Sequence, residues 1–281
     1  TSTLVDVRRS TSAWGDYDND GDLDLAVSGY NGATGVIRLY KNNNGTFTID
    51  EDPFSTIYSV HFASLVWGDY DNDGDLDLVV SGRQNSGDLP STFLYENTNG
   101  TFAVNSTVSA TLTNVQYSAL AWGDYDNDGN LDLVVSGTTN TNNTGAITIL
   151  YKNDGNGGFT DSGISLPNVY WSALSWGDYD NDGDLDLAIS GIDDSDHSIA
   201  KVFKNDGSDG FSDSGATIEG TSYGDIDWGD YDNDGDLDLA ISGYTDTPGT
   251  ITRVYKNTGS HVFTNDAGLS LTGVRNSALS W

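Results

Sequence analysis

The sequence predicts an all-β fold in which one four-stranded unit is repeated five times. The first observation is the stretch Trp14-Gly-Asp-Tyr-Asp-Asn-Asp-Gly-Asp-Leu-Asp-Leu25, which recurs almost unchanged from Trp67, Trp122, Trp176 and Trp228. The second is the spacing of these tryptophans, 53, 55, 54 and 52 residues, with Trp281 a further 53 residues on. A fixed period of this length is typical of repeat architectures. The third is that each period holds four short β-patterned runs and no amphipathic helical period.

The parts of the repeat follow one another in the same order each time. A run of small residues, such as Ser-Ala-Leu-Ala over 118–121, precedes the tryptophan, and the acidic stretch follows it. Next comes Leu-Asp-Leu-Val-Val-Ser-Gly or a close variant, which ends at Gly82 in the second repeat. An alternating run then ends in an aromatic residue, as at Tyr151, and after a turn a last run begins at a phenylalanine, as at Phe159. We therefore expect four antiparallel strands joined by turns.

A four-stranded unit repeated at this length favours a β-propeller, in which each blade buries its sheet faces against its neighbours. We expect residues 1–281 to form one propeller domain of five visible blades, alone or as part of a six- or seven-bladed ring, with a partial sixth repeat at the C-terminus. A solenoid is the alternative, but four strands per 53 residues suits a blade better than a coil. The Trp, Tyr and Phe of each repeat are expected to fill the core between blades.

The acidic stretch is the candidate metal site. Aspartates stand at loop positions one, three, five and nine, and carboxylates so close together repel one another unless a cation lies among them. Hard oxygen ligands at this density suit Ca²⁺, and the glycine at position six permits a sharp turn. Position seven is Asn130 in the third loop and aspartate in the others, so we expect its backbone carbonyl to be the ligand. An acidic surface turn is the plainer interpretation, but its fivefold recurrence argues against it.

The sequence therefore predicts five Ca²⁺ ions, one in each loop. An EF-hand would need a glutamate at position twelve and flanking helices, whereas position twelve of the first loop is Val27 and a strand pattern follows. The candidate ligands are Asp16, Asp18, Asp20, Asp22 and Asp24 in the first loop, and Asp69, Asp71, Asp73, Asp75 and Asp77 in the second. In the other three loops they are Asp124, Asp126, Asp128, Asn130 and Asp132; Asp178, Asp180, Asp182, Asp184 and Asp186; and Asp230, Asp232, Asp234, Asp236 and Asp238.

The loop, followed by Leu-Asp-Leu-Val-Val-Ser-Gly, resembles the FG-GAP/VCBS repeats of integrin α-subunit propellers and of related bacterial and fungal proteins. The resemblance spans essentially the whole chain. It implies that the loop joins the first and second strands of a blade and binds Ca²⁺ through the aspartates at positions one, three, five and nine. Two features depart from it: Ser-Gly stands where the Gly-Ala-Pro half of the family's signature would be, and integrin propellers have seven blades.

Composition excludes several classes of partner and chemistry. The net charge of −32 and only 11 scattered basic residues argue against nucleic acid, and five Ca²⁺ would add ten charges and leave −22. No apolar run is long enough to insert into a membrane. The chain has no cysteine, and His61, His197 and His261 stand at unrelated repeat positions. The loop carboxylates are expected to hold calcium, so we expect no enzyme. Calcium loops of this kind indicate an extracellular setting.

The two faces of the expected disc differ in their variability. The calcium loops are almost invariant, whereas the opposite face carries variable turns and the residues five and six places ahead of each tryptophan. These pairs are Arg8/Arg9, His61/Phe62, Gln116/Tyr117, Tyr170/Trp171 and Ser222/Tyr223. Variable loops on a fixed scaffold carry recognition. We expect a non-enzymatic adhesion or recognition module with a protein or glycan ligand on this face; the alternatives are a structural subunit of a surface layer or filament and a lectin-like domain.

The two ends of the chain contain the same part of the repeat. Aligning Trp281 with Trp14 pairs residues 268–281 with 1–14, and a closed five-bladed ring needs this part once. We expect each end to bring the innermost strand of a blade. Because an open strand edge exposes backbone donors and acceptors, we expect the terminal strand to pair with further chain or, by self-association, with another copy. An excerpt from a longer extracellular chain is the favoured interpretation.

Overall fold

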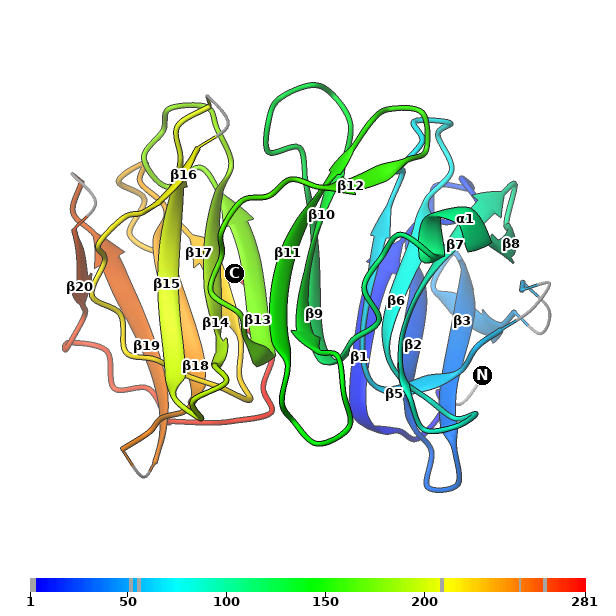
Figure 1. Ribbon diagram of the computed structural model, residues 1–281, viewed down its shortest axis with the longest axis horizontal. Helices are drawn as coiled ribbons and strands as arrows, with labels where there is room; N and C mark the ends of the chain where they lie inside the picture. The colour runs from blue at the N-terminus through cyan, green and yellow to red at the C-terminus, as the bar shows by residue number, and fades with distance from the viewer. Residues whose placement is uncertain (1–3, 51–52, 55–56, 208–209, 248, 260–261) are drawn as a thin grey trace.

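Five four-stranded antiparallel sheets follow one another along the chain, as Figure 1 shows. The computed structural model describes residues 4–50, 53–54, 57–207, 210–247, 249–259 and 262–281, so His261 and residues 1–3 lie outside the described residues. Within every sheet the spatial order of the strands is their order in sequence, which makes each blade a meander. The prediction of five four-stranded blades is confirmed.

The bounds of the elements repeat closely from blade to blade. The first blade comprises β1 (Arg8–Gly15), β2 (Asp24–Tyr30), β3 (Gly35–Asn43) and β4 (Thr46–Ile49). The second comprises β5 (Val60–Gly68), β6 (Asp77–Gln84), β7 (Pro90–Thr98) and β8 (Thr101–Val104). The third comprises β9 (Gln116–Gly123), β10 (Asp132–Thr138), β11 (Ala146–Asn153) and β12 (Phe159–Asp161). The fourth comprises β13 (Tyr170–Gly177), β14 (Asp186–Ile192), β15 (Ser198–Asn205) and β16 (Phe211–Asp213). The fifth comprises β17 (Ile226–Gly229), β18 (Asp238–Tyr244), β19 (Thr250–Asn257) and β20 (Phe263–Asn265).

A short helix interrupts the all-β pattern. This helix, α1 (Ser106–Ser109), lies between the second and third blades, and the side chain of Asn105 caps it by accepting a hydrogen bond from the Val108 amide. A single helical turn is too short to carry an amphipathic period, so the sequence pattern could not reveal it.

The first strands of successive blades lie side by side around the centre of the molecule. β1 contacts β5, β5 contacts β9, β9 contacts β13, and β13 contacts β17. Serine hydroxyls join the second strand of one blade to the first strand of the next: Ser81 to Ser118 at 2.7 Å and Ser136 to Ser172 at 2.7 Å. Small side chains allow this close approach of strands, as the small-residue runs predict. The blades are therefore arranged radially, as in a propeller.

Aromatic residues from two consecutive repeats meet between the blades. Tyr17 of the first repeat stacks on Trp67 of the second at 6.0 Å between ring centroids, and both contact Phe102. The same trio recurs between the fourth and fifth blades, where Tyr179 stacks on Trp228 at 5.8 Å. Tyr17 and Tyr179 are each about 1% exposed, so these rings are core. The prediction that the repeated aromatic residues fill the space between blades is confirmed except at Trp14 of the first repeat, which is 56% exposed.

The glycine after each tryptophan lies directly against the tryptophan of the next repeat. A Cβ atom on Gly123 would lie 2.9 Å from Cδ1 and Nε1 of the Trp176 ring. Real Cβ atoms do not approach heavy atoms so closely, and both groups belong to a packed interface that has little room to relax.

Replacing Gly123 by alanine is expected to lower the free energy of unfolding by about 1–3 kcal/mol, because the added methyl group overpacks the seam between blades three and four. Gly210→Ala is the matched control, since no heavy atom lies within 4 Å of its Cβ position. Urea unfolding of the calcium-loaded proteins measures both effects. Equal midpoints for the two variants would contradict the close-approach explanation.

The C-terminal segment occupies part of the place of a sixth blade without forming a strand. Residues 274–281 contain no strand, so the expected innermost strand at this end is wrong. Trp281 nevertheless lies against Gly229, stacks on Tyr231 at 6.3 Å and directs its Nε1 to the Asp227 carbonyl at 3.4 Å, as Trp67 and Trp228 do with the preceding blade. The missing strand has a physical reason: the described chain offers it no second strand of its own blade to pair with. At the other end, the expected innermost strand is present as β1.

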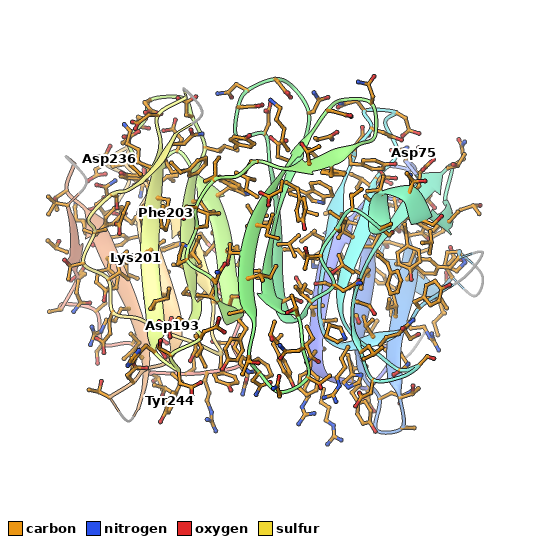
Figure 2. All side chains as sticks on the ribbon, viewed as in Figure 1. Asp75, Asp193, Lys201, Phe203, Asp236 and Tyr244 are labelled. Carbon is orange, nitrogen blue, oxygen red and sulfur yellow. The ribbon has the colours of Figure 1, made fainter. Side chains whose placement is uncertain are left out.

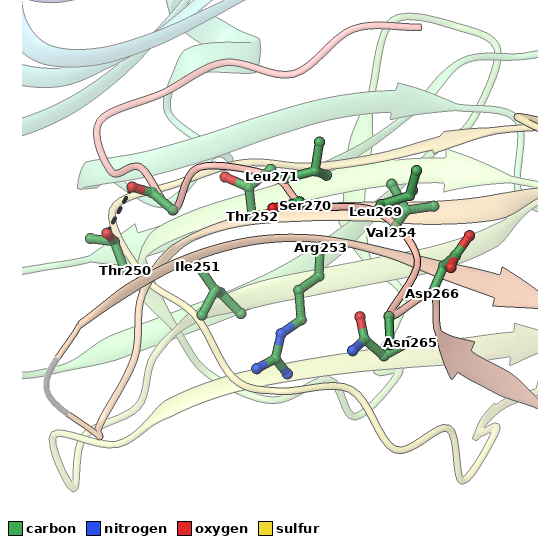
Figure 3. Close-up of a pocket in the computed structure, with 12 residues that line it drawn as sticks. Thr250, Ile251, Thr252, Arg253, Val254, Asn265, Asp266, Leu269, Ser270 and Leu271 are labelled. Carbon is green, nitrogen blue, oxygen red and sulfur yellow. Dashed lines mark hydrogen bonds between the residues drawn. The ribbon is translucent and has the colours of Figure 1, made fainter.

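Residues 266–273, which lead to the C-terminal segment, run alongside β19 of the fifth blade, as the close-up in Figure 3 shows. A groove of about 300 Å³ lies between β19 and residues 266–273, and the Thr250 hydroxyl donates to the Gly273 carbonyl at 2.9 Å across it. Gly220 makes the same kind of backbone approach to Ser198 one repeat earlier. The groove therefore belongs to the regular packing of each blade against the segment that leads to the next one.

Candidate calcium sites and the opposite face

Each acidic loop lies between the first and second strands of its blade, as predicted. In Figure 2, Asp75 and Asp236 of two such loops lie at one edge of the molecule, and Asp193 and Tyr244 of the second-to-third-strand turns lie at the other. We call the edge with the loops the calcium face. The antiparallel topology places the two kinds of turn on opposite faces.

Backbone amides within each loop hold the first and fifth carboxylates in place. In the first loop, the Asp16 carboxylate accepts hydrogen bonds from the amides of Asp20 and Gly21 at 3.1 and 2.9 Å. The Asp20 carboxylate accepts one from the Asp22 amide at 3.0 Å. The same bonds recur in the other four loops. The loop is thus a fixed turn whose carboxylates are ordered by the backbone.

The aspartate at position nine is buried and links the loop to the third strand of its blade. Asp132 is fully buried, and its two oxygens accept hydrogen bonds from the amides of Tyr125 at 3.2 Å and Asn153 at 2.8 Å. The Asn153 side chain in turn donates to the Tyr70 carbonyl of the preceding blade at 2.7 Å. Equivalent bridges start from Asn97, Asn205 and Asn257. Each loop is therefore connected to the neighbouring blade through one asparagine.

Carboxylates from positions one, three and nine converge in four of the loops. One oxygen from each lies within 4.8 Å of the other two in the sets Asp16/Asp18/Asp24, Asp69/Asp71/Asp77, Asp124/Asp126/Asp132 and Asp178/Asp180/Asp186. In the fifth loop the converging set is Asp230/Asp232/Asp234, all exposed. The fifth position of the first four loops and the ninth position of the last lie outside these sets.

The position-seven residues direct their side chains to other partners. Asp75 accepts hydrogen bonds from the Asn99 amide at 2.7 Å and from the Asn19 side chain of the preceding loop at 2.8 Å. Asn72 contacts Asn130 in the same way at 3.0 Å. These contacts engage the side chains of position seven with other residues, and binding of a cation by the backbone carbonyl of that position stays a prediction. The sequence reasoning missed the asparagine at position four, although its recurrence in all five loops was a usable signal.

A lysine side chain reaches the carboxylates of four loops. Lys152 contacts Asp126 and lies 3.5 Å from Asp128, and Lys41, Lys204 and Lys256 do the same in their loops. In the second loop the equivalent residue is Glu96, whose carboxylate accepts hydrogen bonds from Tyr70 and Asn105 at 3.3 and 3.0 Å. The lysines follow the aromatic residue of the third strand, and the sequence reasoning did not assign them.

The residues of the loops fit a calcium ion. Calcium prefers six to eight oxygen ligands, and each loop offers several carboxylates and the position-seven carbonyl. The Oδ1 atoms of Asp18 and Asp126 are buried and have no hydrogen-bond partner among the described residues. A buried carboxylate oxygen without a donor is costly, and a cation would remove that cost.

Burial raises the pKa of the position-nine carboxyls. It raises the pKa of Asp77 to about 8, of Asp132 and Asp186 to about 7, and of Asp24 to about 6. The backbone amides that these groups accept from act in the opposite direction but do not offset burial, and neighbouring aspartates add to the rise. A bound cation favours the ionised form and would lower these values.

The calcium-stripped protein is expected to lose stability as the pH rises from about 5 to about 8. Since the folded pKa values lie above those of the unfolded chain, the folded state binds more protons in this window, and stability falls with rising pH. Urea midpoints of stripped protein at the two pH values measure this. A higher midpoint at the higher pH would contradict it, and saturation with Ca²⁺ should reduce or reverse the trend.

A cavity of about 860 Å³ opens on the face opposite the calcium loops. We call it the axial cavity, because its wall is formed by the first strands of four blades, by the residues just before β17 in the fifth, and by the C-terminal segment. Its principal side chains are Arg9, Phe62, Tyr117, Trp171, Tyr223 and Arg275. Smaller residues, among them Asn276, complete the lining.

The structure brings together half of the residues predicted for this face. Of each pair ahead of the tryptophan, the nearer one lines the axial cavity, whereas Arg8, His61, Gln116, Tyr170 and Ser222 do not. The sequence reasoning missed Arg275 and Asn276, although Asn276 stands five places ahead of Trp281. His61 packs against Tyr30 and Phe62, and His197 lies 3.9 Å from Asp193 in another turn.

Among the described residues, no helix has the length and apolar character needed to span a membrane.

Three solved structures were compared with this chain. A lectin from Agrocybe aegerita that recognises non-reducing terminal N-acetylglucosamine matches with a TM-score of 0.54 and 17% identity, over 92% of this chain and 66% of that one. An exotype rhamnogalacturonan lyase matches at 0.46 and 13%, over 92% and 46% of the two chains. An exo-β-1,3-galactanase from Phanerochaete chrysosporium matches at 0.46 and 10%, over 94% and 64%. This chain therefore spans less than two thirds of each structure, and the likeness to the lectin shows the fold alone.

The family of the chain follows from its repeats. No curated protein matches the chain. Residues 16–80, 81–135 and 137–189 each match the family model of the FG-GAP-like repeat, and together they make up well over half of the sequence. The protein therefore belongs to the family of FG-GAP-like repeat proteins.

Proposed function

We propose that this protein is a calcium-binding propeller that acts outside the cell as a non-enzymatic recognition module. In this proposal the calcium face is scaffold and the opposite face binds the ligand. The observation that carries the proposal is the axial cavity, to which all five blades contribute side chains opposite the loops. Concave sites lined by aromatic side chains and a few polar groups are the usual form of small-ligand sites.

Calcium has a structural role in this proposal. The aspartates at positions one, three, five and nine and the position-seven carbonyl would hold one ion in each loop, and the ion would neutralise carboxylates that otherwise repel. In the third loop, Asp132 at position nine accepts a hydrogen bond from the Asn153 amide of the third strand, and the Asn153 side chain donates to the preceding blade. An ion bound to Asp132 would stabilise both hydrogen bonds. Loops without a design for tight buffering suit the millimolar calcium found outside cells.

The lysines predict that the five loops differ in affinity. Replacing Lys152 by glutamine is expected to tighten calcium binding at the third loop by about tenfold or more, because the ammonium group that competes for Asp126 is removed. Isothermal titration of the variant against the parent protein measures this. Lys201→Gln is the matched control, since Lys201 pairs with Asp213 away from the loops. Unchanged affinity in the Lys152 variant would show that the lysine does not compete.

A glycan is the first ligand class to test. The lectin from Agrocybe aegerita is described as recognising a terminal sugar, and it has a similar fold. In the axial cavity, Tyr117, Trp171 and Tyr223 offer aromatic surface beside polar groups. Aromatic side chains pack on the apolar face of a sugar ring, while neighbouring donors reach its hydroxyls.

Two measurements test the proposal. Calcium titration of the stripped protein is expected to give five ions per chain, and fewer than five would contradict the assignment of every loop. A broad glycan array, read with the calcium-loaded protein and with Trp171→Ala, is expected to show binding that the substitution weakens. Binding that is insensitive to Trp171→Ala would move the ligand site elsewhere, and an array without any bound glycan would contradict glycan recognition. Mass spectrometry of a bound oligosaccharide should find it uncleaved.

A further inference from the structure

We infer that the axial cavity binds an acidic saccharide, with its sugar rings packed on the aromatic side chains and its carboxylates paired with Arg9 and Arg275. The inference rests on the proposed recognition function and narrows its ligand to one chemical class. Three features of the described residues support it: the charge of the cavity, the arrangement of its rings and the backbone that presents them.

The charged residues that line the axial cavity are basic, whereas the molecule as a whole is strongly acidic. The chain has 43 acidic residues against 11 basic ones, yet the cavity lining contains two arginines and no aspartate or glutamate. With the described residues, neither Arg9 nor Arg275 forms an ion pair, whereas Arg83 pairs with Asp88 and Arg253 with Glu219. A guanidinium group without a carboxylate partner is suited to receive one, because its planar fork matches a carboxylate with two parallel hydrogen bonds.

The overall negative charge does not prevent such binding. The acidic loops lie on the opposite face, and charges separated by more than about 10 Å are largely screened at 0.1 M salt. The lining of the cavity offers an entering carboxylate two arginines and no acidic side chain. Local pairing therefore decides the sign of the interaction.

The aromatic side chains form a continuous ladder across the cavity. The Arg9 guanidinium lies 4.3 Å from the centre of the Phe62 ring, which contacts Tyr117 edge-to-face at 4.7 Å. Tyr117 stacks on Trp171 at 4.0 Å, and Trp171 stacks on Tyr223 at 4.4 Å. A saccharide packs the apolar face of its ring on an aromatic surface of this kind.

The backbone that presents these side chains is in a conformation that bulky residues rarely adopt. Arg9, Phe62, Tyr117, Trp171 and Tyr223 all have positive φ, between 46° and 54°. The pairing of the first and second strands shifts at this point in four blades, which marks a bulge that redirects a side chain. The left-handed region costs about 1–2 kcal/mol for a residue other than glycine, and such strain gathers at ligand sites. We therefore attribute the large side chains at these strained positions to the ligand-binding surface that they form in the axial cavity.

Titration of the calcium-loaded chain with two matched oligosaccharides tests the inference. One is a tetrasaccharide of alternating glucuronate and N-acetylglucosamine, and the other is the neutral tetramer of N-acetylglucosamine. The acidic probe is expected to bind at least about tenfold more tightly. Arg9→Gln with Arg275→Gln should remove that preference, and Trp171→Ala should weaken binding of the acidic probe by about tenfold. Arg38→Gln, on the exposed side of β3, is the control and should bind as the parent does.

Each alternative result has a distinct meaning. Equal affinity for both probes, unchanged in the double arginine variant, would overturn the acidic class and leave the proposed glycan recognition standing. Sodium sulfate that competes as strongly as the acidic tetrasaccharide would reduce the site to a bare anion site. Binding of neither probe would overturn the inference, whereas recognition itself is tested by the glycan array. Thermal melts of every variant separate loss of binding from loss of fold.

Discussion

Removal of calcium is expected to lower the melting temperature of this protein by at least about 10 °C. A ligand that binds only the folded state stabilises it by about 2.7 kcal/mol per site at 100 times its Kd, and a stability change of 1 kcal/mol shifts the melting temperature by about 2–4 °C in a domain of this size class. Five such sites give a sum well above the expected shift. Circular dichroism melts in excess calcium and in excess EGTA measure the effect.

The hydrogen bonds of the loops explain why the loss of calcium should destabilise the whole molecule. Without a cation, the carboxylates of each loop repel one another, and the aspartate at position nine is buried. The same aspartate accepts from the amide of an asparagine whose side chain bonds the preceding blade, so a loosened loop also loosens an interface. Recovery on adding Ca²⁺ is the control for the EGTA result. An unchanged melting temperature would remove calcium from the stabilising interactions.

The repeat made most of the fold predictable. One copy of the acidic stretch is compatible with a surface turn, but five copies spaced 52–55 residues apart argue against that explanation and mark the same point in every blade. The same recurrence identified Tyr17, Trp67 and Phe102 as core, which the structure confirms. Repetition multiplies local signals that are individually weak.

What the sequence could not predict depends on contacts between repeats or on departures from them. Asn19 and Asn153 look like ordinary turn residues until the structure shows them bonded to the next loop and to the preceding blade. The C-terminal segment has the sequence of an innermost strand but finds no second strand of its own blade. Arg275 reaches the axial cavity because that segment folds back beside the fifth blade, which is a tertiary effect.

The charge distribution shows how the two faces divide their chemistry. Four of the five lysines reach from the third strands to the carboxylates of the acidic loops, and the two cavity arginines lie on the opposite face. Cations on the calcium face are thus engaged with the protein's own acids, whereas those in the cavity are not. Only the second loop lacks its lysine, and it should hold calcium most tightly because Glu96 adds a negative charge near Asp71.

Replacing Asp132 by alanine is expected to lower the free energy of unfolding by about 3–5 kcal/mol in calcium, the range for breaking a buried charged network. The change leaves the amides of Tyr125 and Asn153 without their acceptor and removes a candidate ligand from the third loop. Calcium titration should then give four ions per chain instead of the five expected for the parent. Urea unfolding gives the stability difference.

Asn130→Ala is the matched substitution two residues earlier in the same loop. If position seven binds through its backbone carbonyl, removing this side chain keeps the ligand, and the variant should still bind five calcium ions. The expected cost is about 1–2 kcal/mol, because the Asn130 side chain accepts one hydrogen bond from Asn72 and donates one to the Asp128 carboxylate. Loss of one ion in Asn130→Ala would show that the side chain is the ligand. Five ions in Asp132→Ala would show instead that position nine serves only the strand connection, and either result would change the assignment of ligands in all five loops.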